Sequence, residues 1–300
     1  MTPAHFLVRA SRTLKNEIYK FLHVDALSGA RVHPVPTLEK IGSERGGWIV
    51  PTNRINRDSV CYCVGVGEDI TFDMSVIERF GCRVFAYDPT PRAALHVQKH
   101  AAHCADYIYE RVGLWDTDEV VRFYAPANPQ NVSHSALNLQ KTDTYFEAPC
   151  KRLRTLLADN GHEHITLLKL DIEGAEYKVV QSIVADRLNI DILCIEYDEA
   201  FHPLDAQYQQ RIAASVKSIL DAGYRLVAIG APGNYTFTKH GNWYFKSRAV
   251  PASGRGWRRA SPEYSAGTSL VPRRTSRHPV CPGDVRLWPH LDDRAVTQLA

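Results

Sequence analysis

The stretch CYCVGVGEDITFD, residues 61–73, decides how this sequence folds. Its β-rich run stops at Gly65, Gly67 follows two residues later, and acidic residues and a helical pattern begin at once. Two glycines so close to the end of a buried strand usually mean that a ligand approaches the backbone where a Cβ would be in the way. The stretch therefore predicts a strand, a turn that binds a ligand, and a helix.

On both sides of this stretch, strand and helix patterns alternate from about residue 58 to residue 247. Helical patterns occupy 71–80, 92–100, 151–159, 175–188 and 206–222. Strand patterns occupy 60–64, 83–87, 107–115, 120–124, a run that starts at 164, 190–197, 224–229 and 235–245. The alternation predicts an α/β fold with a doubly wound, mainly parallel sheet, helices on both faces, and ligands beyond the carboxyl ends of the strands. The last two strands have no helix between them, which predicts one antiparallel strand at the sheet's edge. The runs at 107–115 and 120–124 are expected to form a hairpin or a strand with an extension.

The chain is expected to divide into three segments, 1–57, 58–247 and 248–300. Its first 22 residues carry apolar side chains at helical spacing among basic ones, which predicts an N-terminal helix packed on the domain or on the partner in a homodimer. A helix on a membrane surface is the alternative, and the segment is too polar for a membrane span. After residue 247 the chain has no Lys, six of its 17 Pro and many Arg and Ser, which predicts a disordered basic tail.

Composition and charge narrow the class of protein. Hydrophobic residues make up 44% and charged residues 23% of the chain, values typical of a soluble globular protein. Residues 248–300 carry nine Arg and four acidic residues, which leaves 27 basic and 29 acidic residues in 1–247. The charge balance of the predicted domain therefore offers no obvious sign of a nucleic-acid-binding surface. Seven cysteines without metal-type spacing predict free thiols in a reducing, cytoplasmic setting and no metal site of their own.

The residues after the two glycines indicate which nucleotide the turn binds. A dinucleotide fingerprint needs a small residue at position 70, and this chain has Ile70 there, which disfavours NAD. Asp88 closes the next strand about 20 residues after the glycines, a spacing at which a carboxylate accepts hydrogen bonds from both ribose hydroxyls. The pattern therefore favours an adenosine ligand without a diphosphate. The alternative is that Asp88 only caps the helix that follows it.

Three motifs, CVGVGEDITFD, VFAYDPTPRA and LLKLDIEGAEYKVV, together resemble the FkbM-type family of S-adenosylmethionine-dependent methyltransferases. The resemblance extends from about Ile41 to Tyr197, and KLDIEGAE is its most specific part. It implies a Rossmann-like class I methyltransferase fold, a seven-stranded sheet with one antiparallel strand, and S-adenosylmethionine as the cofactor. It does not extend to the tail after residue 247.

Residue by residue, the resemblance implies a donor site at the strand ends. It puts Gly65, Gly67 and Glu68 against the amino-acid portion of the donor, Asp88 on its ribose, and Gly113, Leu114 and Asp116 around its adenine. Trp115 either covers the adenine or belongs to the core.

Two pairs of carboxylates follow neighbouring strands. Asp171 and Glu173 lie two residues apart, so in an extended segment they point the same way, and Glu196 and Asp198 repeat this spacing after the next strand. Both pairs are expected to face the ligand crevice. Paired carboxylates can orient sugar hydroxyls, act as a base with a raised pKa, or hold a divalent cation such as Mg²⁺, although the pattern does not require a metal. Asp171 is expected to touch both donor and acceptor, and Glu173 to act in catalysis or to cap the following helix.

Three further residues are candidates for the chemistry or its support. His134 and His202 lie on polar loops and are candidate bases, with solvated surface histidines as the alternative. His134 is preferred because its loop precedes the strand that ends at Asp171 and can fold over the crevice. Lys169 lies inside an apolar strand and needs a partner if it is buried, for which Glu173 and Glu176 are the candidates.

The resemblance implies methylation of hydroxyl groups, since members of the family often act on sugars or secondary metabolites. The predicted function is therefore an S-adenosylmethionine-dependent O-methyltransferase that acts on a carbohydrate, a glycan or a glycosylated secondary metabolite. An NAD(P)-dependent oxidoreductase and a non-catalytic nucleotide-binding module are the alternatives. Methylation of nucleic acid is disfavoured because the sequence lacks the Asn-Pro-Pro-aromatic loop used on base amines.

Overall fold

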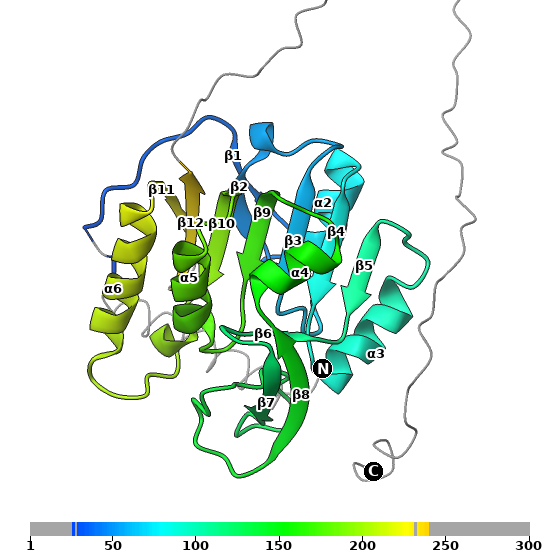
Figure 1. The fold of residues 1–300 in the computed structure, drawn as a ribbon, viewed down its shortest axis with the longest axis vertical. Coiled ribbons are helices and arrows are strands. Elements are labelled where there is room, and N and C mark those ends of the chain that lie inside the picture. Colours follow the sequence, from blue (N-terminus) through cyan, green and yellow to red (C-terminus); the bar gives the residue numbers. More distant parts are fainter. Residues whose placement is uncertain (1–25, 28, 231–232, 240–300) are drawn as a thin grey trace, which may run out of the picture. The chain divides into compact units, whose positions relative to one another are not determined.

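The structure is a computed structural model that describes residues 26–27, 29–230 and 233–239 (Figure 1). The expected N-terminal helix within residues 1–22 and the expected tail at 248–300 lie outside these described residues, as does the end of the strand expected at 235–245. Within the described residues, none of the helices has the length and hydropathy that crossing a bilayer requires.

A seven-stranded sheet forms the centre of the described residues. Its strands lie in the order β11-β12-β10-β9-β3-β4-β5. Their bounds are β3 Val60–Val64, β4 Arg83–Tyr87, β5 Tyr107–Glu110, β9 Ile165–Leu170, β10 Ile190–Glu196, β11 Tyr224–Ile229 and β12 Asn234–Lys239. The pairs from β10 to β5 are parallel, and β12 runs antiparallel to both β10 and β11. The mainly parallel sheet with antiparallel pairing at one edge is therefore confirmed, and β11 is the outermost strand at that edge.

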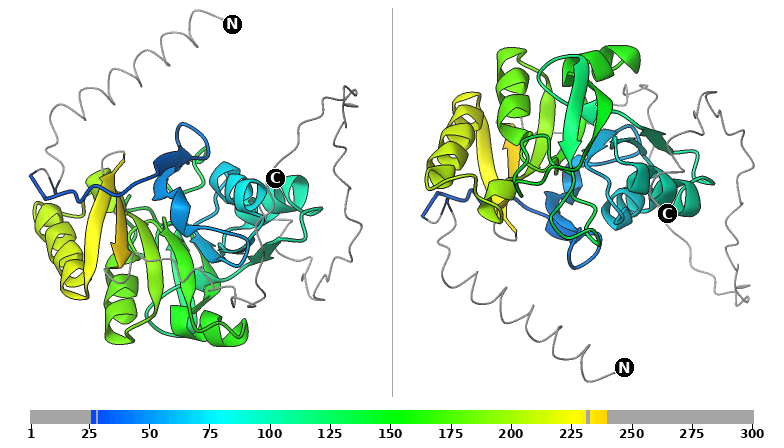
Figure 2. Two further views of the ribbon diagram at one scale, coloured as in Figure 1. Left: turned by 90° about the horizontal axis from the view of Figure 1, so that it is seen from above. Right: turned by 90° about the horizontal axis from the view of Figure 1, so that it is seen from below.

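Helices cover both faces of the sheet, as Figure 2 shows from above and below. They are α2 Thr71–Phe80, α3 Pro91–His100, α4 Leu153–Asp159, α5 Glu176–Ala185 and α6 Tyr208–Asp221, with short 3₁₀ turns η1 Thr52–Arg54 and η2 Asp198–Ala200. One buried cluster joins β3 to α4, α5 and α6, and a second joins it to α2 and α3. Side chains of β3 alternate between them, so Tyr62 and Val64 enter the first cluster and Cys61 and Cys63 the second.

The segment after β3 folds as its sequence predicts. Helix α2 turns Phe72, Val76 and Ile77 into the core, as expected from their spacing. It ends at Gly81, which has a left-handed φ of +66° and whose N–H bonds to the carbonyl oxygen of Ile77. The chain is thereby reversed into β4, which pairs with β3 in parallel.

Two small sheets were not expected from the sequence. Strands β1 (Leu38–Ile41) and β2 (Trp48–Pro51) form a hairpin beside α2. Strands β6 (Gly113–Leu114), β8 (Tyr145–Lys151) and β7 (Glu119–Tyr124) form a three-stranded sheet in that order. The expected hairpin or extension between the runs at 107–115 and 120–124 is therefore wrong, because β7 pairs with β8 instead. Only Ala148 and Cys150 of β8 are buried, so its apolar signal is weak.

Candidate donor and acceptor site

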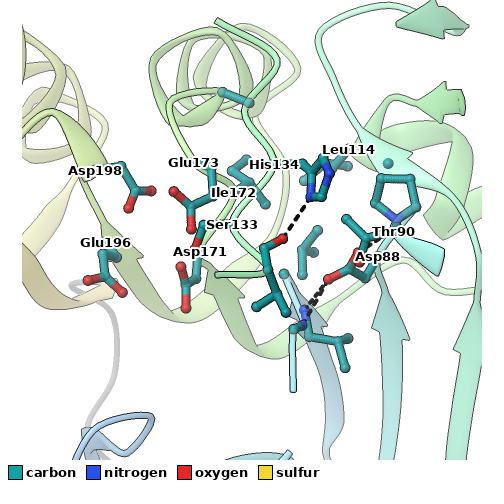
Figure 3. A pocket seen from close by; sticks show the side chains of 18 of the residues that line it. Asp88, Thr90, Leu114, Ser133, His134, Asp171, Ile172, Glu173, Glu196 and Asp198 are labelled. Atoms are coloured by element: carbon teal, nitrogen blue, oxygen red, sulfur yellow. Dashed lines mark hydrogen bonds between the residues drawn. The ribbon is translucent and has the colours of Figure 1, made fainter. Parts of the chain in front are cut away.

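A cavity of about 450 Å³ lies beyond the carboxyl ends of β3, β4, β9 and β10 (Figure 3). This is the edge of the sheet where the sequence predicted the ligand. Figure 3 shows Asp88 and Thr90 on one side of the cavity and the two carboxylate pairs on the other. The lining includes these candidates from the sequence: Gly65, Gly67, Glu68, Asp88, Gly113, Leu114, His134, Lys169, Asp171, Glu173, Glu196, Asp198 and His202. Asp116 does not belong to it.

The turn after β3 needs glycine at its first position. Gly65 has a φ of +82°, and a Cβ there would lie 1.6 Å from the carbonyl oxygen of Asp171. Backbone hydrogen bonds join the ends of β3, β4 and β9 at this turn. Gly65 N–H bonds to Tyr87 O, and Asp171 N–H bonds to Val64 O. The turn therefore packs directly on the backbone that carries the acidic motif.

Asp88 holds this turn from the neighbouring strand. Its Oδ2 accepts hydrogen bonds from the N–H groups of Val66 and Gly67, both at 2.9 Å. Its Oδ1 accepts from the N–H and the hydroxyl of Thr90, at 2.8 and 2.7 Å. Thr90 in turn is the N-cap of α3, with its side chain accepting from Ala93 N–H. The Asp88 side chain is 5% exposed and lines the cavity, so it anchors the turn and the start of α3 from the position predicted for the ribose ligand.

Glu68 links the turn to the loop on the other side of the cavity. Its carboxylate accepts two hydrogen bonds from the Arg92 guanidinium, at 3.0 and 2.8 Å. Arg92 Nη1 also donates to the carbonyl oxygens of 129–131, at 3.1 to 3.4 Å. The next residues, Val132, Ser133 and His134, line the cavity, so one arginine joins the glycine turn to this loop.

The region predicted for adenine is partly assembled. Gly113 and Leu114 line the cavity, and Gly113 packs so closely on β8 that a Cβ would lie 2.5 Å from Cys150 Sγ. Trp115 is buried in a cluster that includes Cys150 and Ala175, so it belongs to the core. Asp116 lies outside the lining, with its Oδ1 3.6 Å from Lys178 Nζ. The structure does not bring Asp116 to the cavity.

The two carboxylate pairs meet in the cavity. Ligand oxygens of Asp171, Glu173 and Asp198 lie within 4.8 Å of one another, and Glu196 lines the same space. Burial, and then the charge of Asp171, raises the pKa of Glu173 to about 7. Burial and the neighbouring carboxylates also raise the pKa values of Glu196 and Asp198 well above their ordinary range. The cluster therefore binds protons at neutral pH more readily than isolated carboxylates do.

The turn after β9 directs Glu173 into this cluster. Glu173 has a left-handed φ of +54°, an uncommon conformation for a residue with a side chain. The Ser135 hydroxyl donates to the Glu173 carbonyl oxygen at 2.6 Å. The helix that follows has no side-chain cap, whereas Glu176 Oε1 accepts from the N–H groups of Ile172 and Gly174. Of the two roles expected for Glu173, the structure therefore contradicts the helix cap.

Lys169 is buried, and the partner expected for it is wrong. Its Nζ lies 3.3 Å from Asp171 Oδ2 and donates to the carbonyl oxygen of Gly65, whereas Glu173 and Glu176 are not its partners. Burial alone would lower the pKa of Lys169, but the charges of Asp171 and Asp73 outweigh it and raise the pKa above the ordinary value. Lys169 therefore stays an ammonium and joins the glycine turn to Asp171.

Both candidate histidines line the cavity. His134 Nδ1 lies 2.9 Å from the carbonyl oxygen of Val132, and its ring contacts Phe146 edge to face. A carbonyl oxygen only accepts, so this hydrogen bond requires the proton on Nδ1, and in the neutral ring Nε2 is then the acceptor. Sequence reasoning missed Ser133, which lines the cavity and interacts with Glu173. Its place beside His134 in the same polar loop was the available signal.

Comparison with known proteins identifies the domain. Residues 50–226 match the model of the methyltransferase FkbM domain family. Over 132 residues the chain is 27% identical to human "Probable methyltransferase-like protein 24", a match that covers 44% of this chain and 30% of that protein. The rat protein of the same name is 27% identical over 126 residues, which is 42% of this chain and 28% of that one. The match thus spans less than a third of these curated relatives.

Solved structures with a similar chain course include two archaeal proteins. The Methanococcus jannaschii fibrillarin pre-rRNA processing protein has 10% identity and a TM-score of 0.38, over 71% of this chain and 87% of that one. Aeropyrum pernix fibrillarin, solved with natively bound S-adenosyl-L-methionine, has 8% identity and a TM-score of 0.37, over 71% of this chain and 85% of that one.

The cavity suits the methyl donor of this family. Its glycine turn leaves backbone exposed at the end of β3, and its carboxylates complement a cationic sulfonium and an ammonium group. The family model matches more than half of the chain, so we conclude that the protein belongs to the FkbM methyltransferase family and that residues 50–226 form an S-adenosylmethionine-dependent methyltransferase domain.

Proposed function

We propose that the protein transfers the methyl group of S-adenosylmethionine to a hydroxyl group of a carbohydrate, a glycan or a glycosylated secondary metabolite. The observation that carries this proposal is the convergence of Asp171, Glu173, Glu196 and Asp198 on one cavity next to the glycine turn. Carboxylates accept short, strong hydrogen bonds from hydroxyl groups, and a group of them matches the adjacent hydroxyls of a sugar.

The donor supplies a methyl group already activated by its sulfonium, so the protein has to align the acceptor and remove a proton. Alignment of the reacting groups lowers the activation barrier by up to about 7 to 11 kcal/mol in well-oriented reactions. A correctly placed base raises the rate by a further factor of about 10² to 10⁴. Glu173, with a pKa of about 7, suits this role at neutral pH, and Nε2 of His134 is the second candidate. Asp171 joins the two halves of the site, because its backbone touches the glycine turn and its carboxylate faces the cavity.

The alternative functions differ in the ligand they require. A nicotinamide-dependent oxidoreductase would need close backbone packing at position 70, whereas Ile70, the N-cap of α2, places a large side chain in the core there. Titration calorimetry with S-adenosylhomocysteine and with NAD separates these two functions. Tighter binding of NAD would refute the proposal.

The test of transfer is a screen of glycans and hydroxylated metabolites with a methyl-labelled donor. Glu173→Gln is expected to reduce transfer at least about 100-fold while the affinity for S-adenosylhomocysteine stays within about threefold. Glu147→Gln is the matched control, because Glu147 lies exposed on β8, paired with Arg122 and away from the cavity. Transfer by Glu173→Gln at the parent rate would remove Glu173 from the mechanism. Donor binding without any transfer would favour the non-catalytic module.

A further inference from the structure

We propose that Asp171, Glu173 and Asp198 bind a divalent cation at the carboxyl ends of β9 and β10. Each residue offers one carboxylate oxygen, and the three oxygens lie within 4.8 Å of one another. Figure 3 shows the three side chains grouped on the same side of the cavity. The role of the ion in methyl transfer rests on the proposed function, but its binding does not.

A second observation points to a cation at this place. The Asp198 side chain is 6% exposed, and its Oδ2 is buried without a hydrogen-bond partner among the described residues. A buried carboxylate oxygen normally receives a donor or a metal ion, because leaving it unpaired is costly. The carboxylate of Asp198 contributes one oxygen to the cluster with Asp171 and Glu173, so a cation held between the three residues would also lie close to Oδ2.

Other buried carboxylates of the chain show what Asp198 lacks. The next residue, Glu199, is fully buried, and Arg211 donates to both of its oxygens. Asp88 accepts four hydrogen bonds from backbone and threonine donors. Donors are thus supplied to both oxygens of Glu199 and of Asp88, whereas Oδ2 of Asp198, like Oε2 of Glu176, has none among the described residues.

The charge of the cluster also favours a cation. The four carboxylates carry up to four negative charges; they belong to Asp171, Glu173, Glu196 and Asp198. Of the residues that line the cavity, all within the described part of the chain, Lys169 is the one with an ammonium or guanidinium group, and it pairs with Asp171. One ammonium offsets one charge, and a divalent cation would offset two more. Such balance is what makes buried carboxylates tolerable side by side.

The donor set indicates which cation fits. All three ligands are carboxylate oxygens, which hard cations such as Mg²⁺, Mn²⁺ and Ca²⁺ prefer. Three protein ligands leave positions for water or for an oxygen of the acceptor. In the transferase this ion would orient the acceptor hydroxyl between the carboxylates and the donor methyl group. A metal-bound Glu173 is a weak base, so with the ion in place Nε2 of His134 would accept the proton.

Binding is tested directly on the full chain after treatment with EDTA, with neither donor nor acceptor present. Electron paramagnetic resonance of free Mn²⁺ should show one site per chain with a Kd below about 1 mM. Asp198→Asn and Glu173→Gln should each weaken Mn²⁺ binding at least about tenfold. Asp118→Asn and Glu147→Gln, on exposed carboxylates away from the cavity, should leave the Kd unchanged.

Thermal unfolding provides the second measurement. Mn²⁺ should raise the Tm of the parent and not that of Asp198→Asn. In EDTA, Asp198→Asn should be at least as stable as the parent, because Oδ2 accepts no hydrogen bond that the substitution would break. A parent Tm that does not respond to Mn²⁺, or Mn²⁺ binding by Asp198→Asn at the parent affinity, overturns the metal site. Mn²⁺ binding without methyl transfer to any acceptor would instead refute the proposed function while still supporting the metal site.

Discussion

The substitution Asp88→Asn tests whether Asp88 supports the glycine turn before any ligand binds. Whichever way the new amide turns, its NH₂ group faces two donors, either Val66 and Gly67 N–H or the N–H and hydroxyl of Thr90. The threonine hydroxyl can rotate to accept, so the least costly orientation loses the bond from Thr90 N–H. That loss costs about 2 kcal/mol. The hydrogen bonds from the N–H groups of Val66 and Gly67 each weaken by about 0.5 kcal/mol, because their acceptor no longer carries a charge. We expect the free energy of unfolding to fall by about 3 kcal/mol.

Urea unfolding followed by circular dichroism measures this change, and titration calorimetry with S-adenosylhomocysteine measures its effect on donor binding. We expect a lower urea midpoint at unchanged slope, and at least a tenfold loss of affinity because the turn is no longer held. Asp118→Asn is the matched control, since exposed Asp118 accepts from Arg152 N–H and the Thr155 hydroxyl. It should cost less than about 1 kcal/mol. A parent-like midpoint for Asp88→Asn with reduced affinity would mean that Asp88 serves only the ribose.

Three further predictions concern Gly65 and Lys169, which line the cavity, and the buried Glu176. Gly65→Ala would put a Cβ 1.6 Å from the Asp171 carbonyl oxygen, so it should lower stability by at least about 2 kcal/mol and abolish donor binding; a parent-like urea midpoint would contradict this. Burial raises the pKa of Glu176 from 4.5 to about 8, so its stabilising effect is complete below pH 4.5 and is lost as the pH rises through about 8. The parent Tm in EDTA should therefore fall between pH 6 and pH 9, and that of Glu176→Gln should fall less; equal slopes would refute the assignment. Lys169→Met leaves the Asp171 carboxylate without its buried cation, so it should lower the free energy of unfolding by about 3 kcal/mol, measured by thermal or urea unfolding. Lys217→Met, at an exposed ion pair, should lower it by less than about 1 kcal/mol, and equal losses for the two variants would contradict the prediction.

The sequence predicted the central sheet well because its strands are buried on both faces. The run at 60–64 is almost wholly apolar, and α2 has clear helical spacing and a glycine stop, so pattern and structure agree. Strand β8 was missed because it alternates between exposed and buried residues and contains Pro149. The β1–β2 hairpin was missed because its four-residue strands are too short to show a period.

The candidate site was predictable where side-chain direction follows from the strand. Asp171 and Glu173 were placed correctly relative to the strand end, although the left-handed turn at Glu173 is tertiary information. Lys169 and Asp171 lie two apart, so the same alternation rule pointed to their pairing, and a longer-range partner was chosen in error. Asp116 was wrongly expected at the adenine because β6 pairs with β8 and not with the large sheet, and no local sequence pattern predicts that pairing.

The bridge made by Arg92 has a consequence for how the enzyme can diversify. It is an exposed ion pair, with 38% and 42% of its two side chains accessible, so added salt weakens it, whereas the buried carboxylate of Asp88 is shielded. High ionic strength should thus loosen the loop that carries Val132, Ser133 and His134, while the turn held by Asp88 keeps its shape. Substitutions around 129–134 would likewise reshape one wall of the cavity without changing the hydrogen bonds by which Asp88 holds the glycine turn.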